Sequence, residues 1–175
     1  MEKEEKDFLL EKIMIEHGNE LVRLAFSYVK DTEIAKDMVQ NTFIKCYKNL
    51  DFFRFDAQIK TWLYRITINE CKDYLKSWHY KMVQVKSLIN ETAKSLLPST
   101  EKTVIDKYDN KEIKDTIFAL PKVYREVVYL YYYESLNIEE MAKVLDIPVN
   151  TVKTRLRRAK QRLGSMIEEA ELHGR

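Results

Sequence analysis

Apolar residues recur every three or four positions along most of the chain, which is the spacing of one face of an α-helix. We expect residues 1–16 to be an acidic-leaning lead-in with at most a turn or two of helix. A helix is predicted from Asn19 to Lys30, and Asp31 and Thr32 are suited to cap the next one. The buried seam of that second helix is expected to comprise Ala35, Val39, Phe43, Cys46, Tyr47 and Leu50.

A third helix is predicted from about Ile59 to Trp78, after a loop at 51–58 in which the periodicity breaks. Between about Met82 and Asn110 the pattern weakens, and Ser, Asn, Thr and Pro interrupt it. We interpret this stretch as a linker, although a surface excursion within one domain remains an alternative.

Periodicity returns at Lys111 with a short helix that ends before Pro121, followed by a helix from Tyr124 to Glu134. Asn137 and Glu140 then approximate a capping box for another short helix. Pro148 suits the first position of the final helix.

The composition supports an all-α protein of one or two domains. The 175 residues are 45% hydrophobic and 33% charged, with only three glycines and three prolines for tight turns. No signal-peptide core and no apolar run near 20 residues is present, so we expect a soluble, intracellular chain. Cys46 and Cys71 are expected to be reduced, buried thiols.

We find no pattern for catalysis. The three histidines are scattered, no Gly-rich phosphate loop is present, and no nucleophile lies beside a base at a recognisable spacing. We therefore expect no enzymatic activity, no metal and no cofactor.

The segment from Val149 to Leu163 concentrates positive charge in a chain whose net charge is only +2. It contains six cations and no acid, and its apolar residues fall in one stripe. A short capped helix, a turn and a half-cationic helix predict a helix-turn-helix whose second helix enters the DNA major groove. The plainer alternative is a solvated charged face.

The tyrosine-rich run YLYYY at 129–133 has two interpretations. Its rings can stack on nucleic-acid bases, or they can belong to the core and its amphipathic rim. We favour the second, because aromatic residues at helical spacing usually pack.

Two longer strings resemble a known family. DMVQNTFIKCYKNLDFF followed by TWLYRITINECKDYLK resembles region 2 of bacterial sigma factors. LPKVYREVVYLYYYESLNIEEMAKVLDIPVNTVKTRLRRAKQRL resembles their region 4. The layout is similar to an extracytoplasmic-function (ECF, or group four) sigma factor of the sigma-70 superfamily. The resemblance implies a region 2 helical bundle at 1–81, a flexible linker at 82–110 and a region 4 helix-turn-helix at 111–175.

The resemblance also implies site residues. Contacts with core RNA polymerase are expected from Asp37, Gln40, Asn41 and Phe43, although Phe43 also falls in the buried seam. Contacts with the melted −10 element are expected from Phe53, Arg54, Trp62, Arg65, Asn69 and Lys72. Contacts with the duplex −35 element are expected from Thr151, Lys153, Thr154, Arg155, Arg157 and Arg158. Of these, Thr151 and Arg155 are the expected phosphate contacts, and the others face base edges. Phe52 and Phe55 make the −10 loop more aromatic than the family pattern.

The implied partners are core RNA polymerase, promoter DNA that is duplex at −35 and single-stranded at −10, and an anti-sigma factor, which in this family is often membrane-bound. No small-molecule substrate is implied. Two rival hypotheses are an autonomous helix-turn-helix regulator that binds duplex DNA as a dimer, and a helical adaptor that binds only protein. The aromatic and basic helix at 59–78 argues against the first, and the acid-free basic helix argues against the second.

Overall fold

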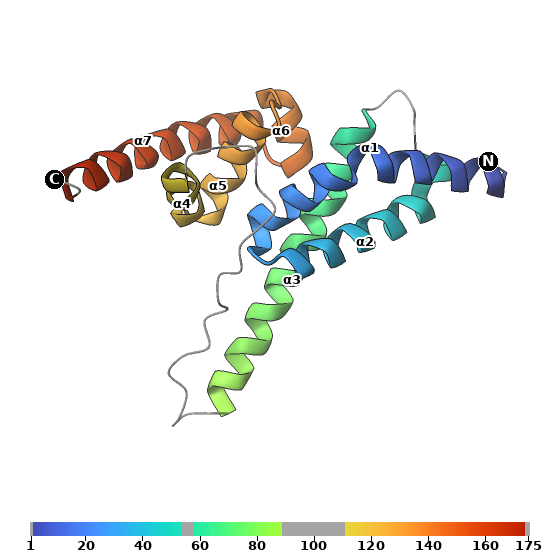
Figure 1. Cartoon of the computed structure of the whole chain (residues 1–175), viewed down its shortest axis with the longest axis horizontal. Coiled ribbons are helices and arrows are strands. Elements are labelled where there is room, and N and C mark those ends of the chain that lie inside the picture. Colours follow the sequence, from blue (N-terminus) through green and yellow to red (C-terminus); the bar gives the residue numbers. More distant parts are fainter. Residues whose placement is uncertain (1, 54–57, 89–110, 174–175) are drawn as a thin grey trace. The chain divides into compact units, whose positions relative to one another are not determined.

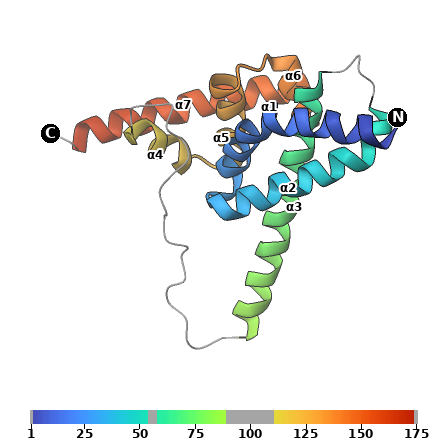
Figure 2. The ribbon, with the colours of Figure 1, turned by 45° about the vertical axis from the view of Figure 1, so that its right-hand side comes forward.

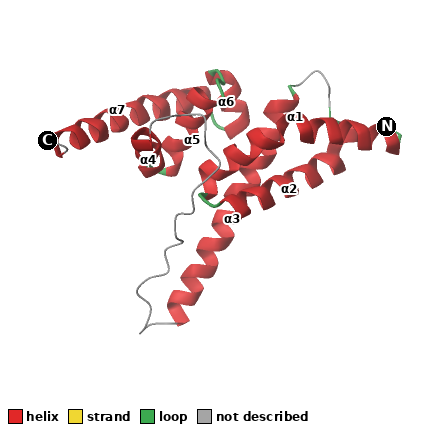
Figure 3. Cartoon of the chain, in the orientation of Figure 1, coloured by secondary structure: helices red, strands yellow, loops and turns green. Residues whose placement is uncertain are grey.

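The computed structural model describes residues 2–53, 58–88 and 111–173, and all regular structure in these ranges is helical (Figure 3). The all-α prediction is therefore confirmed. The elements are α1 (Lys3–Val29), α2 (Thr32–Asn49), the 3₁₀ turn η1 (Leu50–Phe52), α3 (Ile59–Leu88), α4 (Lys111–Ala119), α5 (Lys122–Val128), the π turn η2 (Tyr129–Tyr133), α6 (Ile138–Leu145) and α7 (Val149–His173). None of these helices has the length and apolar character needed to cross a bilayer.

The chain divides into two compact units, one formed by residues 1–54 and 66–104 and the other by residues 55–65 and 105–175. α3 contributes to both. It begins at Ile59, as predicted, but continues to Leu88 and so extends into the stretch interpreted as linker. The rest of that linker, 89–110, and loop residues 54–57 lie outside the described residues.

In the first unit α1 and α2 run antiparallel, side by side (Figures 1 and 2). The sharp reversal between them follows from Lys30 in the left-handed region (φ 60°) and from the Asp31 carboxylate, which accepts the Ile34 N–H at 2.9 Å. Their interface is apolar and buries Leu21, Leu24, Ala25, Ala35, Val39 and Cys46.

The expectation of a mostly irregular lead-in was wrong, because α1 is helical from Lys3. One buried side chain and two polar interactions account for this difference. Ile13 is buried, with 4% of its surface exposed, and Lys6 and Asp7 are tied to the end of α2 by polar interactions described below. The first turns of α1 contain mostly charged residues, so the apolar periodicity used to predict helices is absent there.

α3 packs on α2 through a buried hydroxyl pair. Thr42 Oγ1 donates to the Met38 carbonyl oxygen at 2.8 Å and lies 3.2 Å from Thr67 Oγ1. Cys46 and Cys71 are free and buried, as predicted. Burial raises the pKa of the Cys46 thiol from 9.0 to about 11, because desolvation disfavours the thiolate.

In the second unit α4, α5 and α6 pack against α7 around a core of Val127, Leu130, Met141, Val152 and Ala159. The predicted helix at Tyr124–Glu134 is divided, since α5 ends at Val128 and η2 widens the last turn. Of the tyrosine-rich run, Tyr129 is buried whereas Tyr131 and Tyr132 are 37% and 51% exposed. The interpretation of this run as core plus amphipathic rim is therefore confirmed.

Candidate nucleic-acid interface

The turn between α6 and α7 is built as a helix-turn-helix requires. Asn137 Oδ1 accepts the Glu140 N–H at 2.9 Å, and the Glu140 carboxylate accepts the Asn137 N–H at 2.8 Å, which completes the predicted capping box. α6 ends at Leu145, and the left-handed backbone of its C-cap residue Asp146 (φ 56°) reverses the chain. Asp tolerates this conformation better than most residues do, because its short side chain bonds locally.

Pro148 precedes α7 instead of occupying its first position. Its carbonyl oxygen accepts the N–H groups of Thr151 (2.9 Å) and Val152 (3.1 Å), so Pro148 caps the helix. The prediction was wrong by one residue. At this position the proline still fixes the entry angle of the chain, and its carbonyl starts the hydrogen-bond ladder of α7.

The face of α7 away from the core is cationic. Val152, Leu156 and Ala159 are buried on one side. At about 100° per residue, Lys153, Thr154 and Arg157 point to the other side. Three of the predicted −35 residues are exposed, namely Lys153, Arg157 and Arg158, and two are half-buried, namely Thr151 and Thr154. This face matches the requirement of a recognition helix, because donors to base edges and phosphates stand clear of the core.

Arg155 is the exception among these residues. Its Nη1 donates to Glu126 Oε1 at 2.9 Å, and the Glu126 side chain is only 3% exposed. An arginine that neutralises a buried carboxylate is held within its own domain. Arg155 therefore takes part in the packing of α7 on α5, which argues against its predicted role as a phosphate contact.

Lys160 and Arg162 lie at the flanks of the cationic face, beside tyrosine rings. The Lys160 Nζ lies 5.3 Å from the centroid of the Tyr131 ring and 5.8 Å from that of Tyr132. The Arg162 guanidinium lies 4.9 Å from the Tyr124 ring centroid. These cation–π contacts direct the two cations toward the sides of α7 and leave its central face to the residues named above.

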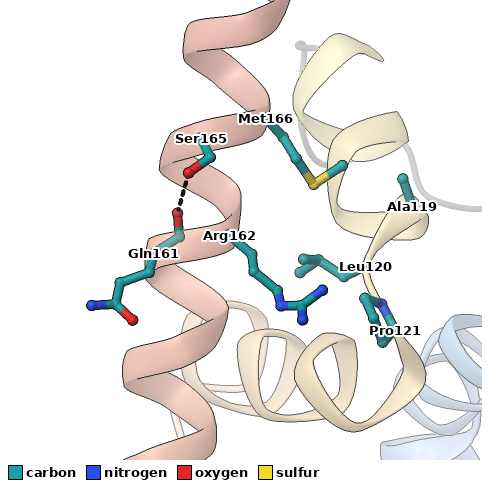
Figure 4. Close-up of a pocket in the computed structure, with 7 residues that line it drawn as sticks. All are labelled: Ala119, Leu120, Pro121, Gln161, Arg162, Ser165 and Met166. Carbon is teal, nitrogen blue, oxygen red and sulfur yellow. Dashed lines mark hydrogen bonds between the residues drawn. The ribbon is translucent and has the colours of Figure 1, made fainter.

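An open hollow of about 430 Å³ lies between α7 and the junction of α4 and α5 (Figure 4). It is lined by Ala119, Leu120, Pro121, Gln161, Arg162, Ser165 and Met166. Only one of these side chains is charged, and the Ser165 hydroxyl is directed to the Gln161 carbonyl oxygen at 3.3 Å. This lining holds no pair of groups suited to general acid–base chemistry.

Four of the residues predicted to contact the −10 element share one face of α3. Trp62, Arg65, Asn69 and Lys72 are spaced by three and four residues, so they form a single stripe along the helix. Arg65 and Asn69 are exposed, whereas Trp62 and Lys72 are half-buried. Phe53 is also half-buried, and Arg54 lies outside the described residues.

The predicted polymerase-binding residues lie on α2. Asp37, Gln40 and Asn41 are exposed on one face, but Phe43 is only 8% exposed and belongs to the core. The contact of Phe43 with core polymerase stays a prediction, and the burial of this side chain argues against it.

Sequence reasoning missed Ile44, which is 53% exposed. It lies at i+4 from Gln40 and i+3 from Asn41, in the middle of the polar face that these residues form. The signal was present in the sequence, since the seam through Val39, Phe43 and Cys46 already excludes Ile44 from the core.

The comparisons with known proteins agree with this arrangement. Residues 13–79 match the family described as Sigma-70 region 2, and residues 110–163 match the family described as Sigma-70, region 4. The RNA polymerase sigma factor SigV of Bacillus subtilis is 32% identical over 151 residues, which cover 86% of each chain. The ECF RNA polymerase sigma-E factor of Haemophilus influenzae is 30% identical over 160 residues, 87% of this chain and 84% of the relative.

Two solved structures share the fold at 23% identity. The sigma factor RpoE in complex with the anti-sigma factor NepR from Bartonella quintana has a TM-score of 0.71 and covers 93% of this chain and 98% of that chain. CnrH in complex with the cytosolic domain of CnrY has a TM-score of 0.63, with coverage of 91% and 88%. Taken with the region 2 and region 4 matches and the sequence relatives, the chain belongs to the ECF family of RNA polymerase sigma factors.

Proposed function

We propose that this chain binds core RNA polymerase and directs it to specific promoters, with the −35 element recognised by α7 and the melted −10 element by α3 and the loop before it. The observation that carries the proposal is the exposed face of α7, where Lys153, Arg157 and Arg158 stand on a helix fixed by a capped turn. Such a face neutralises phosphates and offers donors to guanine in the major groove.

The stripe on α3 supplies the second half of this function. A flipped base needs a hydrogen-bonding partner for its Watson–Crick edge and a path for its phosphates. Asn69 provides an exposed amide, and Arg65 and Lys72 lie one turn away on either side. The chain contributes specificity, and the polymerase performs the chemistry of transcription. This division of labour implies a cytoplasmic location.

The exposed face of α2 is the proposed docking surface for core polymerase. It consists of Asp37, Gln40, Asn41 and Ile44, and Ile44 replaces Phe43 as its apolar member. A polar surface around one apolar anchor is typical of protein interfaces whose binding energy is concentrated in a few residues.

We also propose an anti-sigma factor as a regulatory partner. One solved structure that shares the fold is a sigma factor in complex with an anti-sigma factor, and another is CnrH in complex with the cytosolic domain of CnrY. Copurification of the chain with a protein that blocks its binding to core polymerase would support this partner. If the chain still binds core polymerase fully in the presence of each protein that copurifies with it, the proposed anti-sigma partner is contradicted.

Polymerase dependence of promoter binding tests the main proposal. A duplex promoter fragment is incubated with the full chain, with core polymerase and with both, and binding is followed by mobility shift. The proposal predicts a heparin-resistant complex only when both are present. A tight, specific complex of the chain alone would favour the autonomous regulator.

A further inference from the structure

α1 carries a second apolar stripe on the side away from the core. Phe8 and Ile15 are 70% and 79% exposed, and their spacing of seven residues places them on one face of the helix. Val22 and Phe26 follow at i+7 and i+11 from Ile15, and both are half-buried. The buried Ile13 lies about 140° around the helix from Phe8. We call the stripe and its charged borders the outer face of α1.

Polar contacts hold the first turns of α1 in this orientation. The Lys6 ammonium pairs with the Asp51 carboxylate, and Tyr47 Oη donates to Asp7 Oδ1 at 2.7 Å. Both contacts reach the end of α2, and Phe8 lies about 200° around the helix from Lys6, so its ring is turned outward. Because this backbone is already ordered, the outer face loses little conformational freedom when it binds a partner.

The outer face begins before the part of the chain that matches region 2, which starts at residue 13. Phe8 and the residues of the two polar contacts on α1, Lys6 and Asp7, precede that part. The outer face is therefore built in part from residues that the region 2 match does not include. This favours a contact of this chain's own over one shared by all region 2 domains.

Acidic side chains border the stripe on both sides. The exposed acids are Glu4 and Glu11 on one side and Glu5 and Glu16 on the other. Between residues 4 and 16, Lys12 is the one exposed cation. The outer face thus combines apolar anchors with a border that is predominantly negative.

This charge pattern distinguishes among the possible occupants. Nucleic acid and anionic lipid carry the same sign of charge as the border, so both are repelled. A second copy of the chain would place these acids against one another, and like charges brought together across an interface oppose binding. A helix whose own apolar stripe is flanked by Lys and Arg complements both features. The spacing of seven residues from Phe8 to Ile15 to Val22 is that of a helix packed lengthwise on another helix.

We propose that the outer face of α1 is a docking surface for a basic amphipathic helix of a protein partner, with Phe8 and Ile15 as its apolar anchors. The border acids attract the cations of that helix and fix its orientation. The surface uses none of the residues assigned above to core polymerase or to DNA. The inference therefore goes beyond the proposed function and does not depend on it.

Two designed peptides test this proposal with the full chain. Each is a stapled helix of about three heptads with Leu at positions a and d, and the flanking e and g positions are Lys in one peptide and Glu in the other. Fluorescence anisotropy is expected to show binding of the Lys peptide, weakened by salt, and no binding of the Glu peptide. Phe8→Ala and Ile15→Ala should each lower the affinity for the Lys peptide about tenfold.

Matched variants separate this face from the rest of the surface. Leu172→Ala is the apolar control, because Leu172 is 76% exposed on α7, and it should leave peptide binding unchanged. Glu11→Gln should weaken binding of the Lys peptide and reduce its salt dependence. The same change at Glu139, an exposed acid of α6, should do neither. Far-UV circular dichroism checks that each variant is folded.

Three peptide results would overturn the proposal: no binding of the Lys peptide, equal binding of both peptides, or binding that Phe8→Ala and Ile15→Ala leave unchanged. Sedimentation equilibrium of the chain alone tests the other occupant, and a monomer is expected. A dimer that Phe8→Ala dissociates would mean that a second copy covers this face, and it would also overturn the proposal. None of these results bears on promoter-specific transcription, which is measured separately.

Discussion

Arg155 Nη1 on α7 lies 2.9 Å from Glu126 Oε1 on α5, and the glutamate is almost fully buried. The neighbouring Arg125 donates from Nη1 to the Phe118 carbonyl oxygen at the end of α4 at 3.0 Å. Two adjacent buried residues of α5 therefore contact α4, the helix before it, and α7, the recognition helix. The orientation of the cationic face depends on this pair of contacts.

Replacing Glu126 with glutamine is expected to destabilise the protein, because Arg155 loses its countercharge while part of its surface stays buried. A hydrogen bond to a charged group is worth about 1.5–3 kcal/mol, and we expect a loss of unfolding free energy in that range. Urea unfolding of the full chain measures it. Glu139→Gln, the same change at an exposed position of α6, serves as the control and should differ from wild type by at most about 0.5 kcal/mol. Equal effects of the two changes would contradict the structural role of the pair.

Charge reversal at Arg158 is expected to abolish use of the −35 element. Arg158→Glu replaces an exposed cation of the recognition helix by an anion that phosphates repel. The readout is holoenzyme binding to duplex promoter fragments at several salt concentrations, and the slope of affinity against salt should also decrease. Lys12→Glu, a reversal at an exposed position of α1, should have little effect. Unchanged promoter binding by Arg158→Glu would remove this residue from the interface.

Asn69→Ala is expected to reduce promoter opening and to leave binding to core polymerase intact. The exposed amide of Asn69 is the group proposed to bond the edge of a flipped base, and a buried hydrogen bond of this kind is worth about 1 kcal/mol. Permanganate footprinting of unpaired thymines gives the yield of open complex, and titration with core polymerase gives the binding. An unchanged open-complex yield would show that Asn69 has no part in melting.

Ile44→Ala is expected to weaken binding to core polymerase by about tenfold, since the central residues of an interface contribute most of its energy. Ile15→Ala is the matched control, because Ile15 is 79% exposed on α1 of the same unit. Fluorescence titration of labelled core polymerase compares the two variants. A larger effect of Ile15→Ala would place the docking surface on α1 instead of α2.

The Cys46 thiol is expected to resist modification while the chain is folded. Its pKa, raised to about 11 by burial, keeps it protonated, and the thiolate is the reactive form. Because the folded pKa exceeds the unfolded value, the contribution of this thiol to stability is complete below pH 9. It is lost as the pH rises toward 11. Labelling with a thiol reagent at pH 8 should follow unfolding in urea. Immediate labelling of Cys46 in the native chain would contradict its burial.

The positions of α2, α6 and the start of α3 could be predicted from the sequence, because apolar periodicity and side-chain caps are local signals. The prediction failed where helices are held by polar contacts between residues distant in sequence. In the first turns of α1, Lys6 pairs with Asp51, 45 residues later, and no periodicity encodes this contact. The widened turn at Tyr129–Tyr133 likewise has no local signature that separates it from an ordinary helix end.

For the candidate site, residue type predicted the chemistry better than it predicted exposure. The acid-free face of α7 could be recognised in the sequence. The ion pair of Arg155 with Glu126, which lies 29 residues earlier, could not, because it depends on how α7 packs on α5. Phe43 and Ile44 are adjacent apolar residues, and only their phase relative to the packed seam separates the buried one from the exposed one.

Run-off transcription on a pool of promoter fragments from the source genome tests the central claim most directly. The purified chain is added to core RNA polymerase that lacks other sigma factors, and transcript starts are mapped. Our account predicts a small set of discrete transcripts that require the chain and share sequence elements near −35 and −10. Transcripts that do not depend on the chain, or none at all while the chain alone binds duplex DNA tightly, would contradict it.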